Sequence, residues 1–340
     1  MSTPHPTDPA LRMSWRVRGA LLLLALGLVT VLALMYWWDR EPDRFDVLTN
    51  AREHSLEREE KMVVGTVTAT TLIRVATTLL EKRGGYLAND ILPPGVVMDN
   101  IPEWEKGVVL QVRDLAQALR NDISRSQSQS VEDPDLREAL NRFSAERGKW
   151  IFPSAESQYR DGVGHLEGYL QRLGDDEIDS AQFFARADNL AAYLQLVEKQ
   201  LGSISQRLST SVGQERLNTD LAGDPAAEQR APAPAERTLR TPWLKIDNVF
   251  YEARGSTWAL LHFLQAVEHD FSLVLRDKNA QVSLAQIIRE MEQTQVPLFS
   301  PVVLNGSPYG MFANHSLVMA NYVSRANAAM IDLRKLLDSG

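Results

Sequence analysis

Residues 98–107 read MDNIPEWEKG, and residues 246–255 read IDNVFYEARG. Both stretches hold Asp-Asn followed by a β-branched apolar residue, and both end, after the same interval, in a basic residue and glycine. A pattern that occurs twice in one chain with the same internal spacing indicates a structural unit present in two copies.

The similarity continues beyond these two stretches. At an offset of 148 residues (247 − 99), ten of the sixty positions from Pro94 to Pro153 are identical, with no insertion. Identity this low can arise by chance, so helical periodicity must support it. Apolar residues at three- and four-residue spacing are matched between the copies: Val112, Leu115, Leu119 and Ile123 correspond to Leu260, Phe263, Val267 and Phe271. We therefore predict two related helical units that pack their like faces together.

An uncharged apolar run of 20 residues, GALLLLALGLVTVLALMYWW, occupies residues 19–38. Its length matches the roughly 20 residues that a helix needs to cross the hydrocarbon core of a membrane. A buried core helix is one alternative, but such a helix normally keeps a polar face. A cleaved signal peptide is another, but its apolar region is shorter, about 7–15 residues, and is followed by small residues. The run ends in Tyr36-Trp37-Trp38, aromatic residues typical of a membrane interface, so we predict an uncleaved anchor.

Charges on either side of this run predict its orientation. Arg12, Arg16 and Arg18 precede it against the single Asp8, whereas residues 39–46 hold four acids and two bases. The bias places residues 1–18 in the cytoplasm as a short tail. In a bacterium with two membranes, the anchor would lie in the inner membrane and the main domain in the periplasm. The bilayer is then the partner of residues 19–38.

Composition excludes several classes of protein. The net charge of −8 and the lack of a concentrated basic surface argue against a nucleic-acid partner. The chain has no cysteine, so disulfide frameworks, thiolate metal sites and cysteine nucleophiles are excluded. Hydrophobic content of 44% and charged content of 24% are typical of a folded globular domain.

Apolar spacing predicts an all-α chain, in which no segment alternates well enough to predict a sheet. The units are a first helical unit over 45–210, a flexible Ala/Pro-rich linker over 211–240, and a second helical unit over 241–338 packed on the first. The expected helices span 48–83, 106–123, 135–147, 155–173, 180–210 and a final helix from 315. Gly84-Gly85 would end the first helix, Pro134 and Ser154 would start the third and fourth, and Asn314 would cap the last.

The Asp-Asn segments, Asp99-Asn100 and Asp247-Asn248, are the first candidate site. Asp and Asn side chains commonly bond nearby backbone NH groups, so a structural role in holding turns and helix starts is the simpler interpretation. A functional role would require both segments to meet across a pseudo-twofold axis and form one acidic site. Glu252 lies close to the second segment in sequence and joins them as a candidate acid.

The histidines are weaker candidates. His262 and His269 share one face of a predicted helix, but zinc sites on helices more often use four-residue spacing, so a packed or surface pair is expected. His315 would lie in the first turn of the last helix, where a ligand contact is a further alternative. No set of residues predicts a catalytic, cofactor-binding or metal site, and no cofactor is expected.

The stretches SRSQSQSVEDPDL, WIFPSAESQYRDG, FYEARGSTWALLHFL and NGSPYGMFANHSLVMANYVSRANAA resemble the DUF2333 family of uncharacterised bacterial membrane proteins. The resemblance covers roughly residues 45–336. It implies a proteobacterial inner-membrane protein that faces the periplasm, and it brings no established activity, cofactor or catalytic residue.

Three functions are compatible with these observations. The first is a non-enzymatic, membrane-anchored scaffold that binds another component of the cell envelope. The second is an envelope enzyme that acts on cell-wall or lipid material with acids around Asp99, Asp247 and Glu252. The third is a ligand-sensing domain, which the short tail over residues 1–18 disfavours because it leaves no room for an output module.

Overall fold

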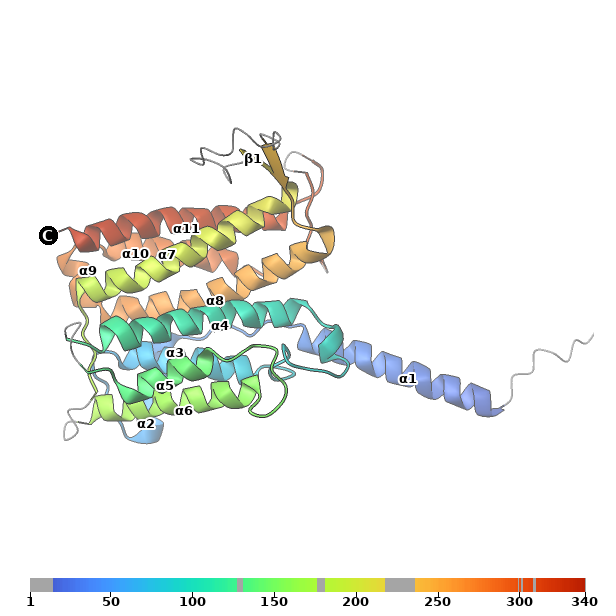
Figure 1. The fold of residues 1–340 in the computed structure, drawn as a ribbon, viewed down its shortest axis with the longest axis horizontal. Helices are drawn as coiled ribbons and strands as arrows, with labels where there is room; N and C mark the ends of the chain where they lie inside the picture. The colour runs from blue at the N-terminus through green and yellow to red at the C-terminus, as the bar shows by residue number, and fades with distance from the viewer. Residues whose placement is uncertain are drawn as a thin grey trace, which may run out of the picture.

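The structure is a computed structural model that describes residues 15–126, 131–175, 181–217, 236–298, 300, 302–307 and 310–339. Helix α1 (Trp15–Trp38) projects from one end of a helical body, and none of its residues is buried (Figure 1). Within these ranges it is the one helix long and apolar enough to cross a membrane. The segment after it turns onto the body, which holds all the remaining helices.

The body is a helical bundle, as the sequence predicts. Its helices are α2 (Val47–Arg58), α3 (Thr66–Glu81), α4 (Asn100–Ala118), α5 (Pro134–Phe143), α6 (Ala155–Gly174), α7 (Ala187–Ser209), α8 (Ile246–Asp270), α9 (Ser272–Asp277), α10 (Gln281–Thr294) and α11 (His315–Asp338). Short helical turns add Gly95–Val97, Leu119–Ile123, Thr210–Val212 and Trp243–Lys245.

Several expected helices have different boundaries. Helix α4 begins at Asn100 rather than at residue 106, and α5 ends at Phe143 rather than at residue 147. The prediction of a single helix over 48–83 is wrong, because α2 ends at Arg58 and α3 starts only after Gly65. Glu59, directly after α2, adopts a left-handed conformation with φ 56°. The sequence around this break is charged on most sides, so it offers no apolar stripe to bury. Helix α7 begins at Ala187 rather than at residue 180.

Two short strands lie inside the predicted linker. Strand β1 (Gln214–Leu217) pairs antiparallel with β2 (Glu236–Leu239), with Gln214 opposite Leu239. The expectation that residues 211–240 hold no sheet is therefore wrong at both ends of the linker. The Thr241 NH donates to the Thr210 carbonyl at 3.1 Å, which brings the linker ends together. The Ala/Pro-rich part of the prediction, residues 218–235, lies outside the described residues.

The helices form two sets with the same internal pairing. In one set α5 and α3 pack on α6; in the other α10 and α7 pack on α11. Both α3 and α7 also contact α4 and α8. Helices α4 and α8 join the sets along the middle of the body (Figure 1). The packing places α7 with the second set, whereas the predicted units separate it from that set at residue 210.

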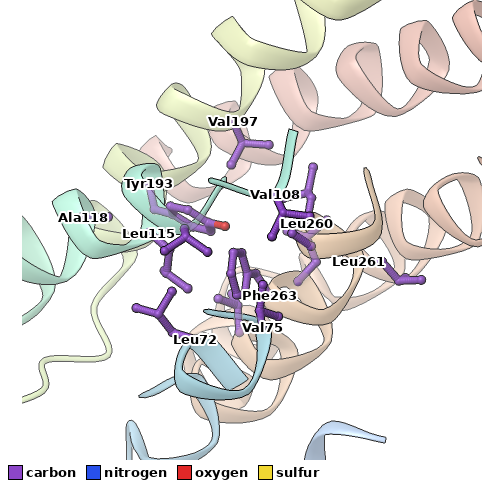
Figure 2. Packing of buried hydrophobic residues seen from close by; sticks show 14 of the residues in the cluster. Leu72, Val75, Val108, Leu115, Ala118, Tyr193, Val197, Leu260, Leu261 and Phe263 are labelled. Carbon is purple, nitrogen blue, oxygen red and sulfur yellow. The ribbon is translucent and has the colours of Figure 1, made fainter. Parts of the chain in front are cut away.

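The core lies where the two sets meet. Leu72 of α3, Leu115 of α4, Tyr193 of α7 and Phe263 of α8 are fully buried and point toward one another (Figure 2). Each helix contributes an apolar stripe, and their burial is the main favourable contribution to folding.

Helices α4 and α8 approach closely at two glycines. A Cβ atom on Gly107 would lie 2.1 Å from the Glu252 carbonyl oxygen, and one on Gly255 would lie 1.9 Å from the Trp104 carbonyl oxygen. The 148-residue offset converts the first contact into the second, since residue 107 corresponds to 255 and residue 104 to 252. Only glycine permits this backbone distance. The two repeated stretches therefore cross each other in the middle of the molecule.

The end of the body from which α1 leaves is termed the α1 end. The described residues that connect α3 to α4, α5 to α6, α7 to α8 and α10 to α11 lie there (Figure 1). The C-terminal end of α11 lies at the opposite end, beside α9 and the start of α10 (Figure 1).

Candidate functional site at the α1 end

Several hollows open at the α1 end, and three of them are lined by residues that follow α1 or by candidate residues. The first, of about 690 Å³, lies between residues 39–44 and the helices α8 and α10. The second, of about 650 Å³, is mostly apolar and lies between α8, the end of α10 and the start of α11. The third, of about 360 Å³, lies between the starts of α4 and α8. The helix ends that meet here therefore form an indented surface.

The third hollow brings the two Asp-Asn segments together. Asp99, Asn100 and Asp247 all line it. Asp99 is the N-cap residue of α4 but its side chain makes no capping bond, and Asp247 accepts a hydrogen bond from the Asn248 NH at 3.1 Å. Burial, followed by the nearby charge of Asp247, raises the pKa of the Asp99 carboxyl. The geometry that the functional interpretation requires, a meeting of both segments, is thus present.

Asp39, directly after α1, adds a third carboxyl group to this region. Its side chain is hydrogen-bonded to Asn100. Although the residue is exposed overall, loss of solvent around its carboxyl raises the pKa to about 6; the Asn100 bond opposes the shift, and the charges of Glu41 and Asp99 add to it. The region therefore favours a neutralising proton or a positively charged group.

Glu252 does not belong to this cluster. Its carboxylate accepts bonds from Arg207 at 2.6 and 2.7 Å and from Lys106 at 2.8 Å, and it is buried between α8, α7 and α4. Burial alone would raise its pKa, but these partners outweigh burial and hold the pKa below its ordinary value. Glu252 thus serves to join three helices, and the structure separates it from Asp99 and Asp247.

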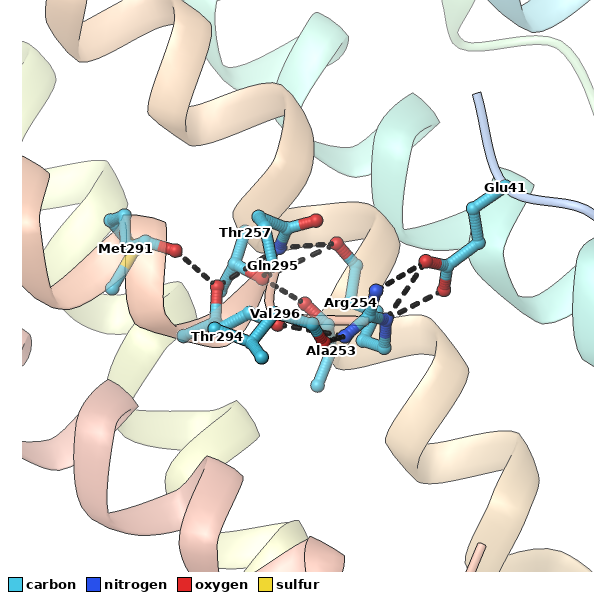
Figure 3. A network of polar contacts seen from close by, with 8 residues as sticks. All are labelled: Glu41, Ala253, Arg254, Thr257, Met291, Thr294, Gln295 and Val296. Atoms are coloured by element: carbon cyan, nitrogen blue, oxygen red, sulfur yellow. Dashed lines mark hydrogen bonds and ion pairs between the residues drawn. The ribbon is translucent and has the colours of Figure 1, made fainter. Parts of the chain in front are cut away.

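A buried arginine fixes the segment that follows α1. The Arg254 guanidinium donates through Nε to Glu41 Oε1 at 2.7 Å and through Nη1 to the carbonyl oxygens of Thr294 and Val296, both at 3.0 Å (Figure 3). Its side chain is 6% exposed. One residue therefore ties together the chain leaving α1, the middle of the body and the end of α10.

A second contact holds the same segment further along α8. The Phe45 NH donates to His262 Nε2 at 3.2 Å, and the two rings stack with centroids 4.1 Å apart. His262 Nδ1 lies 2.7 Å from the Trp258 carbonyl oxygen, which assigns the proton to Nδ1 and leaves Nε2 as the acceptor. Burial lowers the pKa of His262 to about 4, so the ring is neutral at neutral pH.

Residues 254, 258 and 262 lie one turn apart on α8, and this row receives residues 41–45. We call this arrangement the clamp: Glu41 on Arg254, and Phe45 on Trp258 and His262. The sequence prediction missed Arg254 and Glu41. An arginine inside the apolar run of α8 was the available signal, because a buried guanidinium requires partners.

The other histidine of the predicted pair has a different environment. His269 is half exposed and its Nδ1 lies 3.5 Å from Asp270 Oδ1, while Asp270 Oδ2 accepts bonds from the NH and hydroxyl of Thr68 at 2.7 Å. One ring of the pair is thus packed and the other lies at the surface. Within the described parts of the chain, no group of three His, Asp or Glu side chains is placed to hold a metal ion.

Asn314 caps α11 as predicted, since its Oδ1 accepts from the Leu317 NH at 2.9 Å. His315 follows in the first turn and lines the second hollow, and its Nδ1 accepts from the Leu304 NH at 3.1 Å. Burial lowers its pKa. A neutral imidazole thus sits at the wall of an apolar hollow.

The fold and these contacts define a helical-bundle protein with one candidate membrane span attached at its indented end. The chain belongs to the DUF2333 family, described as "Uncharacterized protein conserved in bacteria", whose profile it matches over residues 10–340. No curated protein and no solved structure matches the chain.

Proposed function

We propose that the chain is a single-pass inner-membrane protein, with its N-terminus in the cytoplasm and its helical body in the periplasm. Support comes from the exposed apolar surface of α1 and from the arginines that precede the apolar run. Extraction of membranes at alkaline pH should leave the chain in the pellet. Protease added to spheroplasts should remove the body, and an intact body under those conditions would contradict the orientation.

The body acts, in this proposal, as a non-catalytic platform that binds another component of the cell envelope at its α1 end. The observation that carries it is the clamp, because buried contacts fix the hollows relative to α1. The acidic third hollow and the apolar second hollow open at this same end. Together they suit a component that carries positive charge beside apolar surface.

Photo-crosslinking in cells tests this binding role. A crosslinking amino acid at Val318, an exposed residue that lines the second hollow, should give a discrete adduct. The matched control is Val282, an exposed valine at the start of α10 near the opposite end. Combining the Val318 probe with Asp99→Asn and Asp247→Asn should weaken the adduct. The same adduct from both positions, or none from either, would contradict the proposal.

The alternative of an envelope enzyme is favoured by one observation, the shared hollow of Asp99 and Asp247. Two carboxyl groups in one hollow, one of them with a raised pKa, are a possible acid–base pair. Loss of complementation by Asp99→Asn or Asp247→Asn, with the adduct at Val318 retained, would favour the enzyme. Glu252 is excluded from this role by its ion pairs.

We further infer that the two helical units arose by duplication. The reciprocal contacts of Gly107 and Gly255 support this origin, as does the same pairing of α5 with α6 and of α10 with α11. Structures of more distant members of the family would test it, since a shared origin requires the same crossing in each.

A further inference from the structure

The body exposes large apolar side chains at its α1 end. Phe152 is 85% exposed, Trp243 79%, Phe312 73% and Met311 99%. Three connections between helices contribute these residues, and a fourth, between α3 and α4, exposes Leu92. When such side chains gather on one surface, that surface commonly contacts a partner or a membrane.

Contacts between the connections place them together at this end. The Tyr86 hydroxyl donates to the Arg147 carbonyl at 3.1 Å, which joins the α3–α4 connection to the one that carries Phe152. Trp243 and Val302 line the third hollow with Asp99, which joins the remaining two. The Gly306 NH donates to the Ala313 carbonyl at 3.0 Å. The α10–α11 connection, which holds both Val302 and Phe312, therefore folds back on itself next to Phe312.

The opposite end of the body exposes a different type of apolar side chain. Its exposed apolar residues in the described ranges are aliphatic, such as Val131, Leu273 and Val282. Every exposed Trp and Phe of the described body lies at the α1 end. Aromatic side chains are the ones that proteins place at the boundary between lipid and water.

The α1 end also lies directly against the end of the apolar helix. The Arg83 guanidinium lies 4.7 Å from the centre of the Trp37 ring, and a Cβ atom on Gly84 would lie 2.7 Å from the Trp38 ring. The clamp then fixes residues 41–45 on α8. No spacer therefore separates the body from the last turn of α1.

We infer that the exposed aromatic and aliphatic residues of the α1 end insert into the surface of the bilayer that α1 crosses. The occupant of these exposed side chains is lipid, because the aqueous end of a membrane span sits at the depth of the headgroups. The envelope component proposed above would be confined to the hollows between the helix ends. Lys149, beside Trp150, and Lys245, beside Leu244, supply positive charge suited to anionic headgroups. This inference rests on the proposed role of α1 as a membrane anchor.

The absence of native cysteine allows a direct test with the full chain. Single variants Phe152→Cys, Leu244→Cys and Phe312→Cys carry an environment-sensitive fluorophore in vesicles of phosphatidylethanolamine and phosphatidylglycerol. Val131→Cys and Val282→Cys are the controls at the opposite end, and Leu28→Cys reports on α1. All of these side chains are exposed, so substitution leaves packing intact; circular dichroism checks this for each variant.

Nitroxide-bearing lipids should remove most of the emission from labels at 152, 244 and 312, and little from those at 131 and 282. Quenching at Leu28 with no difference between the two ends would overturn the inference and leave the anchor intact. A lack of quenching at Leu28 would overturn both the anchor and the inference. Quenching of the controls alone would reverse the assigned ends and overturn the inference as well.

Discussion

At the scale of single residues, Gly107 and Gly255 set the distance between α4 and α8. Each faces backbone atoms of the other helix, which cannot move aside as a flexible side chain could. The same crossing brings Gln111 Nε2 within 2.8 Å of Ser256 Oγ, a buried polar contact that requires this spacing. The hydrophobic core packs on both sides of α4 and α8, whose close approach these two glycines permit.

Gly107→Ala and Gly255→Ala should each lower the free energy of unfolding by about 1–3 kcal/mol or more, because an added methyl group forces the helices apart. Gly164→Ala is the matched control, since its Cβ would meet no atom within 4 Å on α6. That change should raise stability by about 0.5–1 kcal/mol through helix propensity. Urea unfolding in detergent measures all three, and equal effects would contradict the crossing.

His262 links stability to pH. Its pKa falls from 6.5 in the unfolded chain to about 4 in the fold, so the unfolded state binds the proton first as pH decreases. The neutral ring contributes about 3 kcal/mol to the free energy of unfolding. This contribution is fully present above pH 6.5 and is lost as the pH falls toward 4. Other groups titrate in this range, among them Asp39, so the informative quantity is a difference between variants.

His262→Gln should therefore have a lower free energy of unfolding than the wild-type chain at pH 7. This difference in unfolding free energy should narrow as pH falls from about 6.5 to about 4. His269→Gln makes the same change at a half-exposed position on the same helix. The free energy of unfolding of this control variant should differ little from that of the wild-type chain. Chemical unfolding at a series of pH values measures both. A difference for His262→Gln that does not change with pH would contradict the assignment of a neutral buried ring.

Local signals at the residue scale were predictable from sequence, and long-range ones were not. Ser154 and Asn314 cap helices as expected, and Pro134 starts α5, because each interacts with backbone within three residues. The partner of Arg254 lies 213 residues away, and no local pattern identifies it. The sequence similarly brought the two Asp-Asn segments to attention, but only the fold shows that they share a hollow.

At the scale of elements, the clamp joins a span to a body through one buried ion pair and one aromatic stack. Removing Arg254 leaves the Glu41 carboxylate without its partner and two carbonyl oxygens, those of Thr294 and Val296, without their donor. Such a loss costs more than the pair itself contributes, because the remaining groups stay partly buried.

Arg254→Met should destabilise the body by about 3–5 kcal/mol, and residues 39–46 should become accessible to protease. The control is Arg276→Met, which removes a solvent-exposed arginine from a weak pair with Asp277 at 4.0 Å and should change stability by less than about 0.5 kcal/mol. Limited proteolysis and urea unfolding are the measurements. Unchanged protection of residues 39–46 in Arg254→Met would contradict the clamp.

Helix existence was predictable from apolar spacing, whereas some helix ends were not. The break between α2 and α3 occurs where Glu59 adopts a left-handed conformation. Glutamate rarely adopts this conformation, so the residue type gives no signal for it in the sequence. The β1–β2 pair has polar, short strands whose partners are far apart in sequence. Next to this pair, bonds between Thr210 and Thr241 hold the two ends of the linker together.

At the scale of the whole molecule, α1 contacts the body only through its last turn and contributes nothing to the buried core. None of the 24 residues of α1 is buried, so the body does not need the span for its core. A chain of residues 39–340 retains the clamp and should fold as a soluble protein. Circular dichroism should show helix loss no greater than the share of α1. A larger loss, or non-cooperative thermal unfolding, would show that the body depends on α1.

The class of the molecule was evident in its sequence, since helical periodicity and one apolar run suffice for it. The arrangement of helices was not, because α7 packs on α11 across more than a hundred residues of chain. Periodicity shows that a helix has a face to bury but does not show which neighbour covers it.

The direction of α8 has one more consequence. Its 25 residues run from the α1 end to the opposite end, and a rise of 1.5 Å per residue gives a length of about 38 Å. In the proposed orientation, the C-terminal end of α11 would then stand roughly that far above the lipid headgroups. A fluorescent tag fused there would be held at a fixed elevation, from which energy transfer to dyes in the bilayer could report tilting of the whole domain.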